Sequence, residues 1–329
     1  MGVAPVPELD SDLDKSSAAP FGDELTGAME SVSQEVALRW GVARLGDIAD
    51  RPRLEAERLL AAVLGMERAL LLAHPEVRLR PAQLQVYGDA VRRRAQGVPL
   101  PYILGRVEFY GLEMLVTPDV LIPRPETELL VETALEDLAG RIASGSSPVV
   151  VDVGTGSGCI AIALAATLPA VRVIAIDIEA AALHVARSNA LRYGVENRVF
   201  CVRDDLLSAV AGPLDLILSN PPYIADHEWA DLPASVRQEP RHALLGGPQG
   251  LSAIRRLLDQ ASFRLAHGGL LLVEIGSRQG DVVRSLAEAA FPTANIEILP
   301  DLAGLDRLLA VRKPSTPTLP SAPFPAERG

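Results

Sequence analysis

Residues 149–166 read VVVDVGTGSGCIAIALAA. The run 149–153 is apolar except for Asp152, glycine then takes every second position of 154–158, and small apolar residues that favour a helix follow. A strand that passes through a glycine loop into a helix is typical of open α/β sheets, and such a loop lets the backbone approach a ligand at the helix N-terminus. The spacing is G-x-G-x-G rather than the G-x-G-x-x-G of dinucleotide-binding proteins, so the loop favours a nucleoside ligand but not a dehydrogenase.

The chain beyond this unit repeats the alternation of strand and helix. Strands that are apolar throughout are covered on both faces, which is typical of a parallel sheet with helices on each side. The last two apolar runs have no helix-length segment between them, which predicts an antiparallel hairpin at the edge. Residues 121–312 are therefore predicted to form an α/β, doubly wound, Rossmann-like domain with a seven-stranded, mostly parallel sheet. The six further strands are predicted at 171–177, 198–202, 214–219, 270–275, 295–299 and 307–312.

The N-terminal third has a different pattern. Between residues 34 and 96, apolar side chains recur at spacings of three and four and are interrupted by proline and glycine, which predicts a bundle of short helices. We place a helical domain at 34–104. The alternation over 101–116, with Gly111 near the turn, predicts a β-hairpin. This hairpin is expected to connect the two domains over residues 105–120.

Composition and charge narrow the class of protein. The formal net charge is −11, and much of it lies in the acidic segment 1–33, which together with the proline-rich tail 313–329 is predicted to be disordered. Between residues 51 and 106, ten arginines stand against five acidic residues. A solvated helix face is the commoner explanation of such a segment, although a local anionic partner stays open. An acidic chain lacks the broad basic face of a general nucleic-acid binder, so stable nucleic-acid binding is not expected.

Cysteine usage and hydropathy predict the compartment. The two cysteines, Cys159 and Cys201, indicate buried thiols in a reducing environment rather than a disulfide framework. Cysteine and histidine do not cluster with zinc spacing, so no metal is expected. The N-terminus lacks the order of a signal peptide, and the most apolar stretch, 149–168, contains Asp152 and three glycines. We therefore expect a soluble, cytoplasmic protein without a membrane partner.

Polar residues follow successive strands of the predicted sheet. Asp177 ends the second strand, where a carboxylate can accept hydrogen bonds from both ribose hydroxyls, and it is equally placed to cap the next helix. Asp204 or Asp205 follows the third strand and offers an acceptor to an adenine amino group, although an acidic loop residue is the commoner explanation. SNPPYI (219–224) follows the fourth strand. Because the carboxyl ends of parallel strands meet at one edge, these residues are expected to converge there with the glycine loop.

The segment NPPY (220–223) offers rigid backbone with carbonyl acceptors, because proline has no N–H and a fixed φ. DVGTGSG, Asp177 and NPPY together resemble the class I S-adenosylmethionine-dependent methyltransferases that act on a planar nitrogen. Four further segments resemble the release factor glutamine methyltransferase family, and the resemblance covers about residues 40–312. These segments are PYILGRVEFYGL (101–112), LIPRPETELLVE (121–132), EPRHALLGGPQGL (239–251) and DLAGLDR (301–307).

The resemblance implies a reaction and a set of site residues. The reaction is transfer of a methyl group from S-adenosyl-L-methionine to the side-chain amide nitrogen of the glutamine in the Gly-Gly-Gln motif of class 1 peptide chain release factors. Asn220 and Pro221 would accept the two amide hydrogens, Tyr223 would lie against the flat amide, Pro222 would stiffen the turn, and Arg124 would border the substrate. Leu206 would stand beside the adenine, where some members of the family have a larger aromatic residue. The implied cofactor-binding residues are Gly154, Thr155, Gly156, Ser157, Gly158, Asp177, Asp205, Leu206 and Asn220.

Other interpretations stay open at several residues. Glu126 and Glu128 are as well explained by a favourable interaction with a helix N-terminus as by a place at the substrate pocket. Glu274 ends a strand and is expected to cap or pair locally, and Trp229 lies in a loop that is suited to a lid. The histidines show no ligand spacing.

Two alternative functions are an adenine-specific nucleic-acid methyltransferase, whose family shares NPPY, and a non-catalytic nucleotide-binding module. Efficient methylation of bare DNA would favour the first, and cofactor binding without turnover the second. In the leading interpretation the helical domain docks the release factor.

Overall fold

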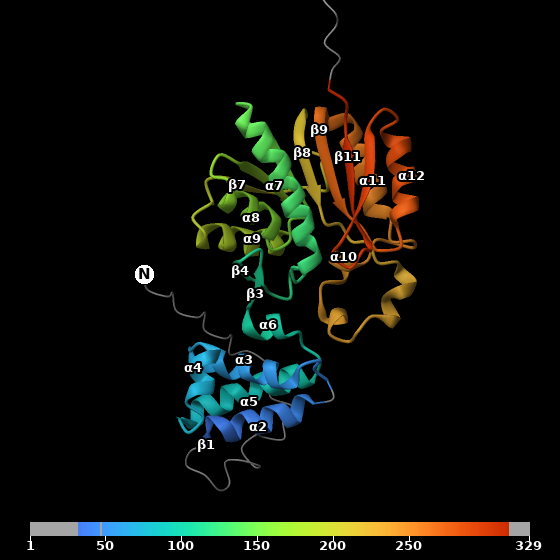
Figure 1. Ribbon diagram of the computed structural model, residues 1–329. Coiled ribbons are helices and arrows are strands. Elements are labelled where there is room, and N and C mark those ends of the chain that lie inside the picture. Colours follow the sequence, from blue (N-terminus) through green and yellow to red (C-terminus); the bar gives the residue numbers. More distant parts are fainter. Residues whose placement is uncertain (1–31, 47, 316–329) are drawn as a thin grey trace, which may run out of the picture. The chain divides into compact units, whose positions relative to one another are not determined.

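The structure is a computed structural model that describes residues 32–46 and 48–315 (Figure 1). The described residues form two compact units, divided between Val98 and Pro99. The segments predicted to be disordered lie outside the described residues, apart from Val32–Ser33 and residues 313–315. Within the described part of the chain, none of the helices combines the length and apolar character that crossing a bilayer requires.

The first unit is the predicted helical bundle. Proline begins two of its helices, at Pro52 and Pro81, where the missing N–H would have had no partner in the helix. Gly65, in the left-handed conformation with φ 65°, ends the first of these. The described elements are β1 (Val32–Ser33), α2 (Gln34–Leu45), α3 (Pro52–Leu64), α4 (Arg68–Ala73), β2 (Arg78–Leu79) and α5 (Pro81–Ala95), with β1 and β2 antiparallel.

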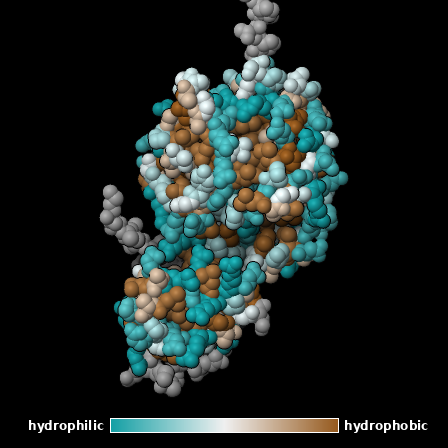
Figure 2. Space-filling model, in the orientation of Figure 1, coloured by the Kyte–Doolittle hydropathy of each residue, from teal (hydrophilic) through white to brown (hydrophobic). Residues whose placement is uncertain are grey.

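Part of the arginine-rich segment is paired inside this unit. The Arg94 guanidinium lies 2.6 Å from the Glu55 carboxylate, and Arg53 and Arg68 both bond to Glu57, which is buried. The surface of the unit also carries apolar side chains, and Figure 2 shows brown patches among the teal on its visible face. Exposed apolar residues of this unit include Leu70, Leu72, Val77 and Val86.

The connecting hairpin is shorter than the alternation of 101–116 predicted. Its strands are β3 (Arg106–Phe109) and β4 (Leu112–Leu115), whereas Leu100–Leu104 form the short helix α6. The strand interpretation of 101–104 is therefore wrong, because Pro101 sits at the helix start and Gly105 ends the helix with φ 70°.

The hairpin is tied to the sheet domain through one buried side chain. Asn189 exchanges hydrogen bonds of 2.7 and 3.0 Å with the backbone of Leu115 and donates to the Ser157 carbonyl at 2.9 Å. The same amide therefore holds both the hairpin and the glycine loop.

The second unit is built on a seven-stranded sheet in the order β10-β11-β9-β8-β5-β6-β7. Neighbouring strands are parallel, except that β11 runs antiparallel to both β9 and β10. This confirms the predicted mostly parallel sheet and the closing antiparallel hairpin. The strands are β5 (Val149–Val153), β6 (Arg172–Asp177), β7 (Val199–Arg203), β8 (Leu214–Ser219), β9 (Leu265–Glu274), β10 (Asn295–Pro300) and β11 (Asp306–Arg312).

Helices cover both faces of this sheet, as the continuous apolar strands predicted (Figure 1). One core joins α7, α8 and α9 to one face, and a second joins α11 and α12 to the other. Adjacent residues of β5 divide between them, with Val150 in the first core and Val151 in the second. The helices of this unit, with its short 3-10 turns, are α6, η1 (Pro125–Thr127), α7 (Glu128–Ala143), α8 (Cys159–Thr167), α9 (Ala180–Arg192), η2 (Asp226–Asp231), η3 (Val236–Gln238), α10 (Arg241–Leu244), α11 (Ser252–Arg264) and α12 (Gly280–Ala290).

The strand order places a ligand site beside β5. From β5 the chain proceeds through β6 and β7 to one edge, then returns to add β8 on the other side of β5. Such a reversal opens a crevice at the carboxyl ends of the two central strands, which is where open α/β sheets bind ligands. The Ser219 hydroxyl donates to the Val153 carbonyl at 2.8 Å, so these two strand ends are joined directly.

Candidate active site

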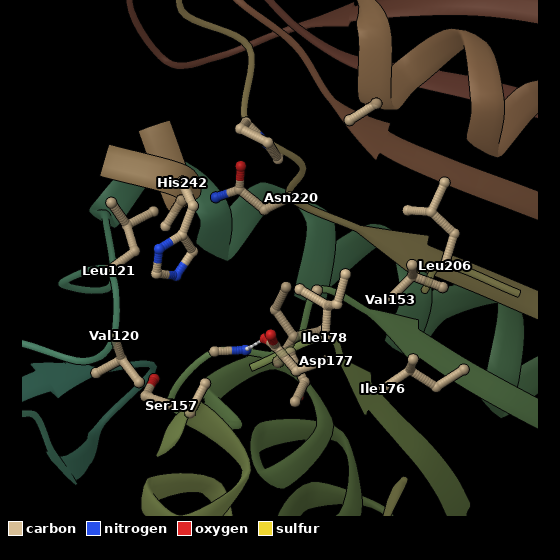
Figure 3. A pocket seen from close by; sticks show the side chains of 18 of the residues that line it. Val120, Leu121, Val153, Ser157, Ile176, Asp177, Ile178, Leu206, Asn220 and His242 are labelled. Atoms are coloured by element: carbon tan, nitrogen blue, oxygen red, sulfur yellow. Dashed lines mark hydrogen bonds between the residues drawn. The ribbon is translucent and has the colours of Figure 1, made fainter. Parts of the chain in front are cut away.

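A cavity of about 270 Å³ opens at the carboxyl ends of the central strands. Figure 3 shows Asp177 and Asn220 on opposite sides of it, with Leu206 at one end and Val120, Leu121 and His242 at the other. Most of the predicted site residues meet here: Gly154, Thr155, Gly156, Ser157, Asp177, Asp204, Asp205, Leu206, Asn220 and Pro222 line the cavity.

Four predicted residues lie outside this lining. Gly158 is at the start of α8, and Pro221 lies between the lining residues Asn220 and Pro222. Tyr223 lines a second cavity of about 710 Å³, and burial raises the pKa of its hydroxyl to about 12. Arg124 is paired with a buried carboxylate instead.

The glycine loop has the conformation that its sequence predicted. Gly154 and Gly156 have φ of 72° and 53°, a region that residues with a Cβ rarely adopt. The amides of Gly154 and Thr155 both donate to the Ile176 carbonyl at 2.8 Å, and the Thr155 hydroxyl donates to Asp152 at 2.6 Å. Burial raises the pKa of Asp152 to about 7. The loop is thereby fixed against the ends of β5 and β6 and presents its open side to the cavity.

Asp177 does not cap α9, which was one of its two predicted roles, because the N-cap residue is Glu179 and no side chain caps the start of this helix. Its carboxylate accepts the Gly156 N–H at 2.9 Å and the Glu179 N–H, at the start of α9, at 3.0 Å. Burial raises the pKa of this carboxyl, against the opposing effect of the two amide hydrogen bonds. Since a carboxylate has about four lone-pair sites, the same oxygens keep acceptor capacity toward the cavity.

The loop after β7 supplies the far wall. Asp204 accepts two backbone N–H groups, from Asp205 at 2.9 Å and Ala209 at 2.7 Å, and the Asp205 carboxylate pairs with Arg256 at 2.6 Å. Leu206 has φ of 57°, a strained value for a residue with a branched side chain, and lines the cavity.

Residues 220–223 (NPPY) form a segment that we call the ledge. The orientation of the Asn220 side-chain amide in it is defined by hydrogen bonds. The Asn220 Nδ2 donates to the Thr127 hydroxyl at 3.1 Å, and that hydroxyl donates to Glu274 at 2.6 Å. With its nitrogen end held from behind, the Asn220 amide has its oxygen end available as an acceptor. Within the described residues, no N–H donates to the Pro221 carbonyl.

Two glycines allow a second chain segment to support the ledge. A Cβ on Gly246 would collide with the Pro222 carbonyl oxygen, and a Cβ on Gly250 would collide with that of Tyr223. The Tyr223 carbonyl also accepts from Gln279 Nε2 at 2.9 Å. The GGPQG stretch (246–250) is therefore glycine-rich because backbone packs on backbone.

Replacing Gly250 by alanine should displace the ledge and lower turnover about 10-fold, since misplacement of a reacting group by about 1 Å can cost up to 100-fold. Gly304→Ala is the matched control, because Gly304 has a similar φ of 76° but open space around the added Cβ. Both changes should cost about 1–2 kcal/mol of stability for the left-handed backbone. Steady-state rates and thermal unfolding of the two variants would separate the effects. Equal rates in both would contradict the supporting role of Gly250.

The segment 121–128 forms another wall of the cavity, and one buried residue holds it. Glu239 accepts the Ile122 N–H at 3.1 Å and pairs with the Arg124 guanidinium at 2.6 Å, while it is itself 5% exposed. Glu128 begins α7 and accepts the Tyr110 N–H at 2.8 Å. Leu121, Pro123 and Thr127 line the cavity from this segment.

Sequence reasoning missed several residues of the site. Thr127 and Glu239 lie in the segments 121–132 and 239–251, and the structure shows that both are buried. Their place within these segments was the one signal in the sequence, since burial is visible only in the structure. His242 has no ligand spacing in the sequence, but it lines the cavity. Trp229 stacks with Arg241, whose guanidinium carbon lies 5.1 Å from the ring centroid, and so ties its loop to α10. Within the described residues, no group of three or more histidine, cysteine or acidic side chains could hold a metal ion.

The fold and the site together define a class I methyltransferase, a class whose members in general use S-adenosylmethionine. Residues 36–105 match the family profile described as PrmC N-terminal domain, and residues 126–239 match the methyltransferase small domain. The chain belongs to the release factor glutamine methyltransferase family.

Two relatives illustrate the similarity. The release factor glutamine methyltransferase of Moorella thermoacetica is 48% identical over 266 residues, which cover 80% of this chain and 93% of the relative. That of Chlorobaculum tepidum is 46% identical over 268 residues, with coverage of 79% and 90%.

Proposed function

We propose that this chain transfers a methyl group from S-adenosyl-L-methionine to the side-chain amide nitrogen of a glutamine in peptide chain release factors, within the Gly-Gly-Gln motif of the class 1 factors. The observation that carries the proposal is the polarity of Asn220 at the cavity. Its nitrogen is tied to Thr127, so its oxygen is available to a donor, and the Pro221 carbonyl is the next acceptor along the ledge. Two fixed acceptors suit a primary amide, which has two N–H donors on one nitrogen.

The chemistry needs orientation more than a strong base. An amide nitrogen is a weak nucleophile, because its lone pair is delocalised into the carbonyl group. If Asn220 and Pro221 hold both hydrogens, the plane of the amide is fixed and the nitrogen faces the cavity, an effect that can contribute several kcal/mol. The nitrogen becomes far more acidic once it carries the methyl group, so its proton can then leave to water. Tyr223 would pack against the flat amide, and Arg124 would border it.

The lining of the cavity fits S-adenosylmethionine. Asp177 keeps acceptor capacity for ribose hydroxyls, and Asp205 stands near Leu206 for an adenine amino group and ring. The glycine loop turns its open side to the cavity, where a Cβ on Gly154 or Gly156 would meet open space. When bound, the cofactor supplies an electrophilic methyl group on a sulfonium sulfur.

The direct test is mass spectrometry of purified release factors after incubation with the protein and methyl-labelled cofactor. We expect a gain of one methyl group on the glutamine of the Gly-Gly-Gln motif, and none when that glutamine is replaced by alanine. Labelling of bare DNA but not of release factors would overturn the proposal in favour of an adenine methyltransferase. Cofactor binding without label transfer to any substrate would favour a non-catalytic module.

We further propose that the helical unit docks the body of the release factor. Removal of residues 1–98 should leave cofactor affinity within about twofold, while activity on an intact release factor should fall at least about 10-fold more than activity on a short Gly-Gly-Gln peptide. The reason is that a single loop offers little contact area for affinity. Parallel assays on the two substrates measure the difference. Equal losses on both substrates would contradict a docking role.

A further inference from the structure

Three side chains from separate elements form a hydrogen-bonded chain behind the ledge. Asn220 follows β8, Thr127 ends η1, and Glu274 is the last residue of β9. Thr127 and Glu274 are 2% and 1% exposed, so solvent does not compete for their hydrogen bonds. The chain runs in one direction, from the Asn220 N–H to the Thr127 oxygen and from the Thr127 O–H to the Glu274 carboxylate.

We propose that Thr127 and Glu274 are positioning residues, which determine the end of the Asn220 amide that faces the substrate. This inference rests on the proposed function. The oxygen and nitrogen ends of a carboxamide have nearly the same shape but opposite hydrogen-bonding roles. If the Asn220 amide were flipped, its N–H groups would face a substrate nitrogen that has only N–H donors. No hydrogen bond could then form, and the substrate amide would not be held.

Thr127 alone cannot choose between the two orientations, because a hydroxyl both donates and accepts. An ionised carboxylate only accepts. The Thr127 hydroxyl therefore donates its hydrogen to Glu274 and keeps only its lone pairs for Asn220. Asn220 can then bond to Thr127 only as a donor, through its N–H. Glu274 thus determines the orientation of both hydrogen bonds, and through them it determines that the Asn220 oxygen is the atom that faces the substrate.

The surroundings of the Glu274 carboxyl group support a positioning role. Its second carboxyl oxygen, Oε1, is buried and has no hydrogen-bond partner in the described part of the chain. Buried polar atoms without a partner are uncommon because their desolvation is not compensated, so packing does not account for a carboxyl here. Burial raises the pKa of Glu274 to about 7, with the Thr127 hydrogen bond acting in the opposite direction. The ionisable groups that face it from neighbouring segments are Arg307, Glu126, Arg124, Tyr223 and Cys159.

The first test separates position from stability. Thr127→Val keeps the shape of the side chain but removes its hydroxyl, and we expect kcat on a release factor to fall about 10-fold with cofactor affinity within about twofold. Thr127→Ser should restore most of the rate. Thr133→Val is the matched control on α7, because the Thr133 hydroxyl donates to the Leu129 carbonyl of its own helix at 2.8 Å and takes no part in the site. Thermal unfolding of all three variants would show whether a loss of rate follows a loss of fold.

The second test uses pH on the full-length protein with a release factor as substrate. Above pH 7 the Glu274 carboxylate only accepts, whereas below it the protonated group can donate as an amide can. The ratio of kcat for the parent to kcat for Glu274→Gln should therefore be near 1 below pH 6 and rise to about 10 above pH 8. Any other titrating group, such as Asp152, is common to both proteins and cancels in this ratio.

The outcomes distinguish the two proposals. A parent protein that transfers no methyl group to a release factor overturns the proposed function and the positioning role with it. If the parent is active, two results together overturn the positioning role alone. The ratio of kcat for the parent to kcat for Glu274→Gln does not vary with pH, and Thr127→Val has the same rate as the parent. A pH-dependent ratio together with rescue by Thr127→Ser supports both.

Discussion

Asn220→Ala should lower kcat/KM for methylation of a release factor about 100- to 1,000-fold, the range for loss of one preorganised hydrogen bond at a reacting group. The alanine variant lacks the acceptor that holds one amide hydrogen, so the substrate nitrogen loses its fixed orientation. It also leaves the Thr127 hydroxyl without the N–H that it now accepts. The effect should fall mainly on kcat, because most of the cavity wall is unchanged. Initial rates with labelled cofactor at saturating concentration measure it.

A matched asparagine controls for removal of an amide. Asn295 lies in β10, is exposed, and donates to Glu297 at 2.7 Å, away from the cavity. Asn295→Ala should retain the parental rate and stability. If Asn220→Ala, shown by calorimetry to bind the cofactor normally, also retained the parental rate, the ledge could not be the element that orients the nitrogen.

Asp177→Ala should weaken S-adenosylmethionine binding by at least about 10-fold. Hydrogen bonds to a charged group contribute about 1.5–3 kcal/mol each, and we expect the ribose to make one or two of them with this carboxylate. The change also removes the acceptor that fixes the Gly156 N–H, so the glycine loop loses an anchor. Titration calorimetry gives the affinity, and kcat at saturating cofactor should change much less than KM for the cofactor.

Asp301→Ala is the matched control, since Asp301 also accepts backbone N–H groups, from Ala303 at 2.9 Å and Leu305 at 3.1 Å, but lies in the turn between β10 and β11. It should lose stability without losing cofactor affinity. Equal affinity in the parent and Asp177→Ala would remove Asp177 from the cofactor site and leave it only as an acceptor of the Gly156 and Glu179 N–H groups.

The sheet could be predicted because its signals are local. Each strand is a short apolar run between turn residues, and the glycine loop has a spacing that only a tight turn explains. The start of β9 at Leu265 was missed, because His267, Gly268 and Gly269 interrupt the apolar run and mask the first half of the strand. Residues 101–104 alternate like a strand, but proline and glycine at the two ends make them a short helix.

The residues that complete the site could not be predicted in the same way. Thr127 and Asn220 are 93 residues apart in the chain, and Thr127 and Glu274 are 147 apart. Periodicity carries no information about which distant polar groups meet. Glu274 was expected only to cap or pair locally, but its partner is Thr127 of η1, which lies far from it in the chain.

The Ser219–Val153 hydrogen bond has a consequence for the geometry of the cavity. The glycine loop extends from β5 and the ledge from β8, and adjacent strands lie about 4.8 Å apart. Backbone pairing therefore determines how far apart these two walls of the cavity begin. We expect substitutions that loosen the surrounding loops to leave this separation unchanged.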